Sequence, residues 1–528
     1  MGIGWHLEEA EKVFIQVLFF VVSVSLTLFF FIYGFNHYYL LSASRRYSLP
    51  RLEPPSENLP TVCIHLPIYN EKYVVRRLVN ACAKMADHYD RRKVRILLLD
   101  DSTDDTYEEV KKIAAEYAAN GFLIEVIHRH NRQGFKAGAL EAALEKTPEE
   151  FIAIFDADFI PEVDFLNRTI PYFIQDERLG IVQSRWCHLN RDYNLLTFAV
   201  AIAIDIHFSI EQTGRYVLGL YQNFNGSGGV LRKKAIIEAG GWQSDTLTED
   251  LDLSYRMQLQ DYKMLYVKDL DSPAEIPPTV PSFQQQQGRW ANGSLRTAKK
   301  ILPSIIRKDG LAFKQRLQAF IHLTGYLIHP LMTISFIVTC IGTLANLNNP
   351  NVLQVYLFSQ VQGLISFGRA LAIISFERSA WTFLGPLIVL CTIAPWISSI
   401  SILRVEKYPF FRNLAGFLVL LLLGFGLSLS NTLEIAKGVL TNRSWEFSRT
   451  PKYAQLDEKT GWQTKKYQTA LNPIWIGEFV FAFLGIFTVG FAVAHSNFGV
   501  LLVLIPFTIA YCYIFLQTVR QSQPSKAG

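Results

Sequence analysis

Long apolar segments without charged residues are the feature that most constrains this chain. Residues 13–41 contain no charged side chain. At about 1.5 Å per residue, a helix of this length exceeds the hydrocarbon core of a bilayer, which is about 30 Å thick. The composition agrees, because 50% hydrophobic and 18% charged residues are too apolar for an ordinary soluble protein. The pattern predicts further membrane spans at 318–346, 353–376, 380–402, 412–434, 474–495 and 498–519.

The charges around these spans predict their orientation. Acidic residues precede the first span, whereas Arg45, Arg46 and Arg51 follow it, so the positive-inside rule places the next segment in the cytoplasm. Counting seven spans also returns residues 435–473 and the C-terminus to the cytoplasm. The same count puts the basic loop at 404–412 outside, so either span 353–376 is interfacial or the rule is broken locally.

Between the first two spans the sequence takes on the character of a soluble α/β domain. Residues 48–60 read as a proline-containing linker, and short apolar runs at 62–64, 96–99, 123–127 and 151–154 read as buried strands. Helical patterns at 104–119 and 137–144 lie between them, which predicts a parallel sheet with crossover helices. Residues 195–210 are apolar but short and contain Asp205 and His207, so we expect a helix buried against this sheet.

Polar residues follow three of the expected strands, where ligands bind in open α/β sheets. Two carboxylates, Asp156 and Asp158, come directly after one strand and suit Mg²⁺ or Mn²⁺ with a diphosphate. Glu71 and Asp101 follow the other two and are candidates to accept hydrogen bonds from a base or ribose. Alone, an Asp-x-Asp pair is equally consistent with an ordinary turn at the end of a strand.

Three further motifs complete a possible transfer site. Lys136 stands just before a helix, where phosphate binds well, although a solvated lysine is the simpler explanation. The acids after Thr248 include Asp250, a candidate general base; alternatively, Thr248 is only an N-cap. Trp290 offers a flat apolar face to a sugar ring, or is a tryptophan at the membrane interface. Together the motifs describe transfer of a sugar from a nucleotide sugar to an alcohol.

The chain resembles the membrane-integrated family-2 glycosyltransferases of the cellulose-synthase-like group. The resemblance covers about residues 60 to 470 and rests on four motifs in order: Asp100-Asp101, Asp156-Ala157-Asp158, Thr248-Glu249-Asp250 and Gln286 through Trp290. Other stretches are most similar in sequence to plant mannan and xyloglucan-backbone synthases and to similar bacterial enzymes. The resemblance implies a cytoplasmic GT-A domain, α/β and Rossmann-like, inserted between transmembrane helices that form a channel.

The resemblance also implies roles for individual residues. Catalysis is assigned to Asp250 with Glu249 and Thr248, the metal to Asp158 with Asp156, and the acceptor to Trp290 with the flexible loop of Asn225, Gly226 and Ser227. A gating loop, alternatively a charged linker, is formed by Phe447, Arg449, Thr450 and Lys452. The nucleotide sugar is assigned to Tyr69, Glu71, Asp100, Asp101, Lys136, Asp156, Gln286 and Arg289.

These assignments predict a processive, inverting synthase of a β-linked hexose polymer, most simply β-1,4-linked, that exports its product through the membrane. UDP-glucose is favoured as the donor, and GDP-mannose is possible. The alternatives are a non-processive enzyme that glycosylates a lipid such as a polyprenyl phosphate or ceramide, and a catalytically inactive scaffold or transporter. The net charge of +5 gives no reason to expect a nucleic-acid partner, and a homo-oligomer is possible.

The chain is predicted to be a multi-pass membrane protein with its catalytic domain in the cytoplasm. The membrane would be the plasma or inner membrane in a bacterium, or the Golgi membrane in a plant. The expected domains are a first transmembrane helix at 1–47, the GT-A domain at 48–311, transmembrane helices at 312–434, the gating segment at 435–473, and two more helices with a short tail at 474–528.

Overall fold

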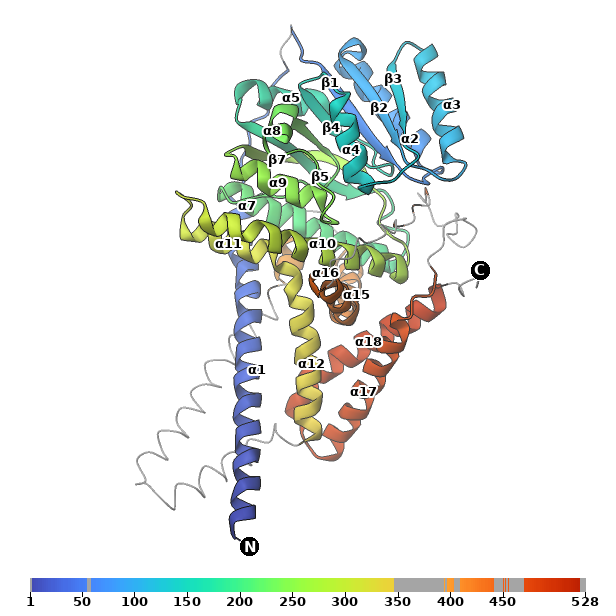
Figure 1. Cartoon of the computed structure of the whole chain (residues 1–528). Coiled ribbons are helices and arrows are strands. Elements are labelled where there is room, and N and C mark those ends of the chain that lie inside the picture. The colour runs from blue at the N-terminus through green and yellow to red at the C-terminus, as the bar shows by residue number, and fades with distance from the viewer. Residues whose placement is uncertain are drawn as a thin grey trace.

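The computed structural model describes residues 2–54, 58–345, 397–402, 409–440 and 470–522, and positions 394, 450, 452 and 454. An α/β domain lies at one end of the molecule, and long helices extend away from it (Figure 1). The predicted spans 353–376 and most of 380–402 lie outside the described residues, as do Phe447 and Arg449 of the expected gating loop.

A seven-stranded mixed sheet forms the centre of the domain, in the order β3-β2-β1-β4-β6-β5-β7. The expectation of a parallel sheet is correct for β1 to β4 but wrong for β6, which is antiparallel to both of its neighbours. Strand β6 follows helices at the carboxyl edge of β5 without a crossover, so it must run back in the opposite direction. The strands are β1 Val62–Ile68, β2 Val94–Asp100, β3 Leu123–His128, β4 Phe151–Ile154, β5 Leu179–His188, β6 Gly229–Arg232 and β7 Lys263–Ala274.

Helices cover both faces of the sheet because successive strand residues point to opposite sides. On one face, Ile64 and Leu66 pack against α2 (Val75–Tyr89), α3 (Thr106–Ala119) and α5 (Phe165–Gln175). On the other face, Cys63 and Leu97 pack against α4 (Phe135–Glu145), α8 (Lys233–Glu238) and α9 (Glu249–Leu259). Both cores are almost fully closed to solvent, so the sheet is a rigid platform for the loops at its carboxyl edge.

Two helices run across the base of this domain, α10 (Val280–Arg307) and α11 (Phe313–Leu323), whereas α1 (Gly2–Ser44) and α12 (Ile328–Leu344) extend away from it (Figure 1). The sequence predicts a single span at 318–346. The structure has the end of α11 and the whole of α12 in this stretch, separated by the short turn η3 (Gly325–Leu327).

Within the described part of the chain, five helices are long and apolar enough to cross a membrane, which confirms that membrane-capable helices flank the α/β domain as expected. A sixth candidate is the pair α15 (Phe410–Gly426) and α16 (Ser428–Leu440), which meet at a bend of 43°. The five are Val21–Ser44, Leu195–Val217, Gly325–Leu344, α17 (Ile474–Ala494) and Phe498–Gln521, the last of which contains η5 (Phe498–Val500) and α18 (Leu501–Gln521).

The segment Leu195–Val217 differs from the other four because 72% of its most apolar stretch is buried inside the protein. It comprises α6 (Leu195–Ile206), a π-helical turn η2 (His207–Gln212) and α7 (Thr213–Val217). Helix α6 packs tightly on α15, where a Cβ added to Gly416 would lie 2.5 Å from Cδ1 of Phe198. The α/β domain is therefore joined to the membrane helices by direct side-chain packing.

We expect Gly416→Leu to lower the melting temperature of the detergent-solubilised protein, because overpacking of this kind costs about 1–3 kcal/mol. Gly424→Leu, on the same helix but with open space around the added Cβ, is the matched control. Equal melting temperatures for the two variants would contradict the packing of α6 on α15.

Candidate functional site

One cleft at the carboxyl edge of the sheet collects most of the residues singled out from the sequence. Strands β1, β2 and β4 supply residues at their ends, α4 and α9 supply residues from their first turns, and α10 closes the cleft from below. The predicted residues in its wall are Tyr69, Glu71, Asp101, Lys136, Asp156, Asp158, Asn225, Thr248, Glu249, Asp250, Gln286, Arg289, Trp290, Thr450 and Lys452.

Lys136 lies at the centre of the charged groups. Its ammonium donates to Oδ1 of Asp156 at 2.5 Å and to the backbone carbonyl of Gly226 at 2.9 Å, and lies 3.9 Å from Oε1 of Glu249. Burial alone would lower the pKa of this lysine, but the nearby carboxylates of Asp156 and Glu249 raise it above its ordinary value. The lysine therefore stays charged inside the cleft.

The two acids at the start of α9, Glu249 and Asp250, also have raised pKa values, which for a carboxyl group favours the uncharged form. Burial is the main cause for both, and the charge of Glu249 adds to it at Asp250, whose pKa rises to about 7. Leu251 donates its backbone N–H to Oδ1 of Asp250 at 2.8 Å, which fixes the carboxyl group. A carboxylate with a pKa near neutral pH is suited to accept a proton during catalysis.

Thr248 does not act as the side-chain N-cap that the simpler sequence interpretation required. No cap hydrogen bond forms from its side chain; instead its hydroxyl lies 3.1 Å from that of Thr297 on α10. This contact ties the start of α9, which carries Glu249 and Asp250, to α10.

The carboxylates expected to hold a metal ion are compatible with one. Asp158 is almost fully buried, and its Oδ2 accepts from the backbone N–H of Glu275 at 3.0 Å and from the ammonium of Lys452 at 2.6 Å. This oxygen therefore already has two donors, and a metal ion would compete with the ammonium of Lys452 for it. In the described part of the chain no cluster of three His, Cys, Asp or Glu side chains suits a metal. Mg²⁺ or Mn²⁺ would therefore rely on Asp158, Asp156 and phosphate oxygens, a mode typical of nucleotide sites.

The adjacent acids Asp100 and Asp101, both predicted to bind the nucleotide, have different protein partners. Asp101 accepts from Nε and Nη2 of Arg129, at 2.7 and 2.5 Å, and Arg129 also donates to the carbonyl of Phe135. This ion pair therefore holds the loop that leads into Lys136. Asp100 is fully buried, contacts Nδ1 of His128 at 2.6 Å and does not line the cleft.

The cleft also contains residues that were not predicted from the sequence. The guanidinium of Arg132 stacks on the ring of Tyr69, with its carbon 3.3 Å from the ring centroid. Trp186 meets Trp290 edge to face, with centroids 6.3 Å apart. Arg132 lies four residues before Lys136 in the same loop, so it could have been predicted from its position in the sequence. Trp186 comes from β5 and is brought to the cleft only by the fold.

The loop Asn225-Gly226-Ser227, expected to bind the acceptor, directly contacts the charged residues of the cleft. Asn225 lines the cleft, and Gly226, with a φ of +77°, leaves no room for a side chain because an added Cβ would lie 2.8 Å from Oδ2 of Asp250. Ser227 is buried, and its hydroxyl accepts the backbone N–H of Asp156 at 2.9 Å. In this structure Gly226 and Ser227 position the charged groups, and only Asn225 faces the cleft.

Comparison with known proteins gives the class to which this fold and site belong. The family model described as glycosyl transferase family 2 matches residues 63–209, and that described as glycosyl transferase family group 2 matches residues 151–429. The second match covers more than half of the chain. The chain belongs to glycosyl transferase family 2, and the predicted enzyme class is confirmed.

Individual relatives come from plants. Glucomannan 4-beta-mannosyltransferase 2 of Arabidopsis thaliana is 37% identical over 262 residues, 49% of each chain. Glucomannan 4-beta-mannosyltransferase 7 of the same plant is 32% identical over 391 residues, 70% of each chain. Several of these alignments thus span only about half the length of the curated relatives. A solved structure, mannosyltransferase PcManGT from Pyrobaculum calidifontis in complex with GDP-Man and Mn²⁺, matches 71% of this chain and 98% of its own with 18% identity and a TM-score of 0.46.

The raised pKa of Asp250 predicts a stability effect with a defined sign. Between about pH 4 and 7 the folded protein keeps a proton on Asp250 that the unfolded chain releases, so the free energy of unfolding falls as the pH rises through this range. Asp250→Asn has no proton to lose at this position, so the variant avoids this loss of stability at high pH. We expect the variant to melt higher than the wild type at pH 8, by about 2–5 °C, and at the same temperature near pH 4.

Asp309→Asn is the control for a change of charge alone, because Asp309 is exposed and has no ion pair among the described residues. An Asp250→Asn variant that melts no higher than the wild type at pH 8 would show that Asp250 is not held in a destabilised, protonatable state.

Proposed function

We propose that this protein transfers a hexose from a nucleotide sugar to a hydroxyl group of a growing β-linked glycan, with inversion at the anomeric carbon. The observation that carries the proposal is the buried carboxyl of Asp250, with its pKa raised to about 7, beside the ammonium of Lys136 in one cleft. The first group suits proton removal and the second suits a leaving diphosphate.

Asp250 acts as the general base in a single displacement. The acceptor oxygen forms a bond to the anomeric carbon while the bond from that carbon to the diphosphate breaks, and the bonding electrons leave with the diphosphate. The proton of the acceptor hydroxyl passes to the Asp250 carboxylate. Attack from the face opposite the nucleotide converts an α-linked donor into a β-linked product.

Lys136, Arg289 and the first turn of α4 hold the diphosphate as its negative charge grows. Two cationic side chains and a helix N-terminus that favours anions line the same part of the cleft. Asp158 and Asp156 would hold Mg²⁺ or Mn²⁺, which supplies further charge neutralisation at the leaving group. Tyr69, Arg132 and the Asp101–Arg129 pair form the adjoining wall, which is suited to the nucleoside.

The relatives change the order in which donors should be tested. Their names describe 4-β-mannosyltransferases that act in glucomannan, which favours GDP-mannose and a β-1,4 linkage over the UDP-glucose favoured by the sequence alone. Synthesis of a polymer and its passage between the membrane helices remain part of the proposal. They are supported by two indole rings in the wall of the cleft, those of Trp290 and Trp186, because a sugar ring can stack on the flat face of an indole.

A transfer assay with protein purified in detergent tests this function. GDP-mannose and UDP-glucose are offered separately, with Mn²⁺ or with chelator, and the product is sized. We expect a mannanase-sensitive polymer from GDP-mannose, its loss with chelator, and a fall in kcat on the order of 10³-fold or more in Asp250→Asn, with nucleotide binding retained. A small glycolipid product would mean that the acceptor is a lipid and not a growing polymer. Full activity of Asp250→Asn would show that Asp250 is not the general base.

Trp290→Ala should weaken acceptor binding because the variant loses the flat face on which a sugar ring stacks. We expect the KM for an oligosaccharide acceptor to rise about 10-fold or more, with donor binding unchanged. Trp475→Ala is the matched control, since Trp475 packs against Phe515 on the membrane helices and lies away from the cleft. Equal effects of the two substitutions would mean that Trp290 is an interfacial anchor only.

A further inference from the structure

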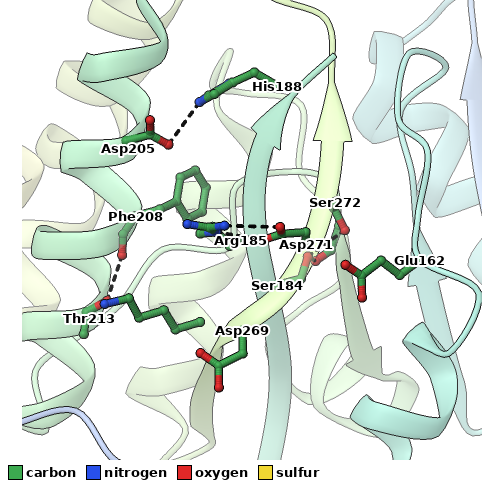
Figure 2. A network of polar contacts seen from close by, with 12 residues as sticks. Glu162, Ser184, Arg185, His188, Asp205, Phe208, Thr213, Asp269, Asp271 and Ser272 are labelled. Atoms are coloured by element: carbon green, nitrogen blue, oxygen red, sulfur yellow. Dashed lines mark hydrogen bonds and ion pairs between the residues drawn. The ribbon is translucent and has the colours of Figure 1, made fainter. Parts of the chain in front are cut away.

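A π-helical turn lies directly behind the acceptor loop. This turn, η2, interrupts the helical segment between α6 and α7, and such interruptions occur frequently at functional sites. The hydroxyl of Thr213 donates to the carbonyl of Phe208, five residues earlier, at 2.9 Å (Figure 2). In a turn of this width, residues four and five positions apart share a face, so Glu211 and Gln212 both lie beside His207.

The hydrogen bonds from this turn to Asn225 can be oriented without ambiguity. The backbone carbonyl of Asn223 can only accept, so the side-chain amide that faces it at 2.5 Å must be the NH₂ group of Gln212. The same NH₂ group lies 3.0 Å from Oδ1 of Asn225. The amide of Asn225 is thereby fixed with its oxygen towards Gln212 and its NH₂ group towards His207.

His207 is fixed in turn. Its Nε2 lies 3.3 Å from Nδ2 of Asn225, which can only donate, so Nε2 must accept. The proton of the neutral ring then sits on Nδ1, which donates to Oε2 of Glu211 at 2.8 Å. A carboxylate that sets the tautomer of a histidine in this way also fixes the orientation of its ring.

Asn225 connects the Glu211–His207 pair to the cleft. One hydrogen of its NH₂ group is used by His207, and among the described residues no other group accepts from this amide, which lines the cleft. The next residue, Gly226, accepts from Lys136 and lies against Asp250. We infer that Glu211 and His207 are positioning residues that fix Asn225 as a hydrogen-bond donor to a hydroxyl of the acceptor sugar beside Asp250. This inference rests on the proposed function.

A double-mutant cycle between His207 and Asn225 tests this inference. We expect His207→Phe and Asn225→Ala each to raise the KM for an oligosaccharide acceptor about 10-fold, with nucleotide binding unchanged and kcat altered much less. Because His207 acts through Asn225, the double variant should be no worse than Asn225→Ala alone. His207→Gln, whose side-chain oxygen can still accept from Asn225, should recover most of the acceptor affinity.

The pair His188 and Asp205 provides the matched control. It is also a buried histidine–carboxylate pair, with Nε2 and Oδ1 3.1 Å apart, and Asp205 lies on the same helical segment as His207 (Figure 2). We expect His188→Phe to leave the acceptor KM unchanged. Where either phenylalanine variant does not fold, the isosteric substitutions Glu211→Gln and Asp205→Asn give the same comparison.

Two results would overturn the inference: additive effects of His207→Phe and Asn225→Ala, or an acceptor KM that is unchanged in His207→Phe. These failures are distinguishable from failure of the proposed function. If Asp250→Asn abolishes transfer while the cycle is additive, only the role of His207 and Glu211 falls. If Asp250→Asn keeps full transfer, the proposed chemistry falls as well.

Discussion

The ion pair of Lys136 with Asp156 is the interaction on which the rest of the site depends. The lysine joins its own helix α4, the end of β4 and the carbonyl of Gly226 in the loop before β6. Three carboxylates, those of Asp156, Glu249 and Asp250, face this one ammonium, and buried charges are tolerated only where they are compensated. The guanidinium of Arg289 lies close to the same carboxylates, so the cleft already holds two compensating cations. Burial and the neighbouring charge of Glu249 still disfavour the ionised form of Asp250, and its pKa is raised for this reason.

Helix α10 connects this electrostatic centre to the membrane helices. It carries Gln286, Arg289 and Trp290 into the cleft and meets α9 through the contact of Thr297 with Thr248. On its other side Asn292 donates to the carbonyl of Glu434 on α16, and Gln284 donates to the buried carboxylate of Glu478 on α17 at 2.6 Å. The part of the cleft that α10 forms is thus positioned by α16 and α17, so the α/β domain and these helices form one connected structure.

Much of this was predictable because it depends on local sequence. Strand β4 followed by Asp156 and Asp158, and the acids of Glu249 and Asp250 at a helix start, were located from short-range patterns. The reversed direction of β6, the bend between α15 and α16, and the arrival of Trp186 beside Trp290 were not, because each depends on contacts between distant segments. Asp100 and Asp101 show the remaining difficulty: two adjacent acids look alike in the sequence, but one is buried against His128 and the other pairs with Arg129.

The central claim is that Asp250 and Lys136 carry out a single displacement, and the anomeric configuration of the product tests it most directly. An α-linked donor labelled with ¹³C at the anomeric carbon would be converted by the purified protein, and the linkage read by NMR of the isolated product. A single displacement predicts a β-linked sugar throughout, with no signal from an α-linkage. An α-linked product would require a second displacement or front-side attack, and would contradict the proposed roles of Asp250 and Lys136.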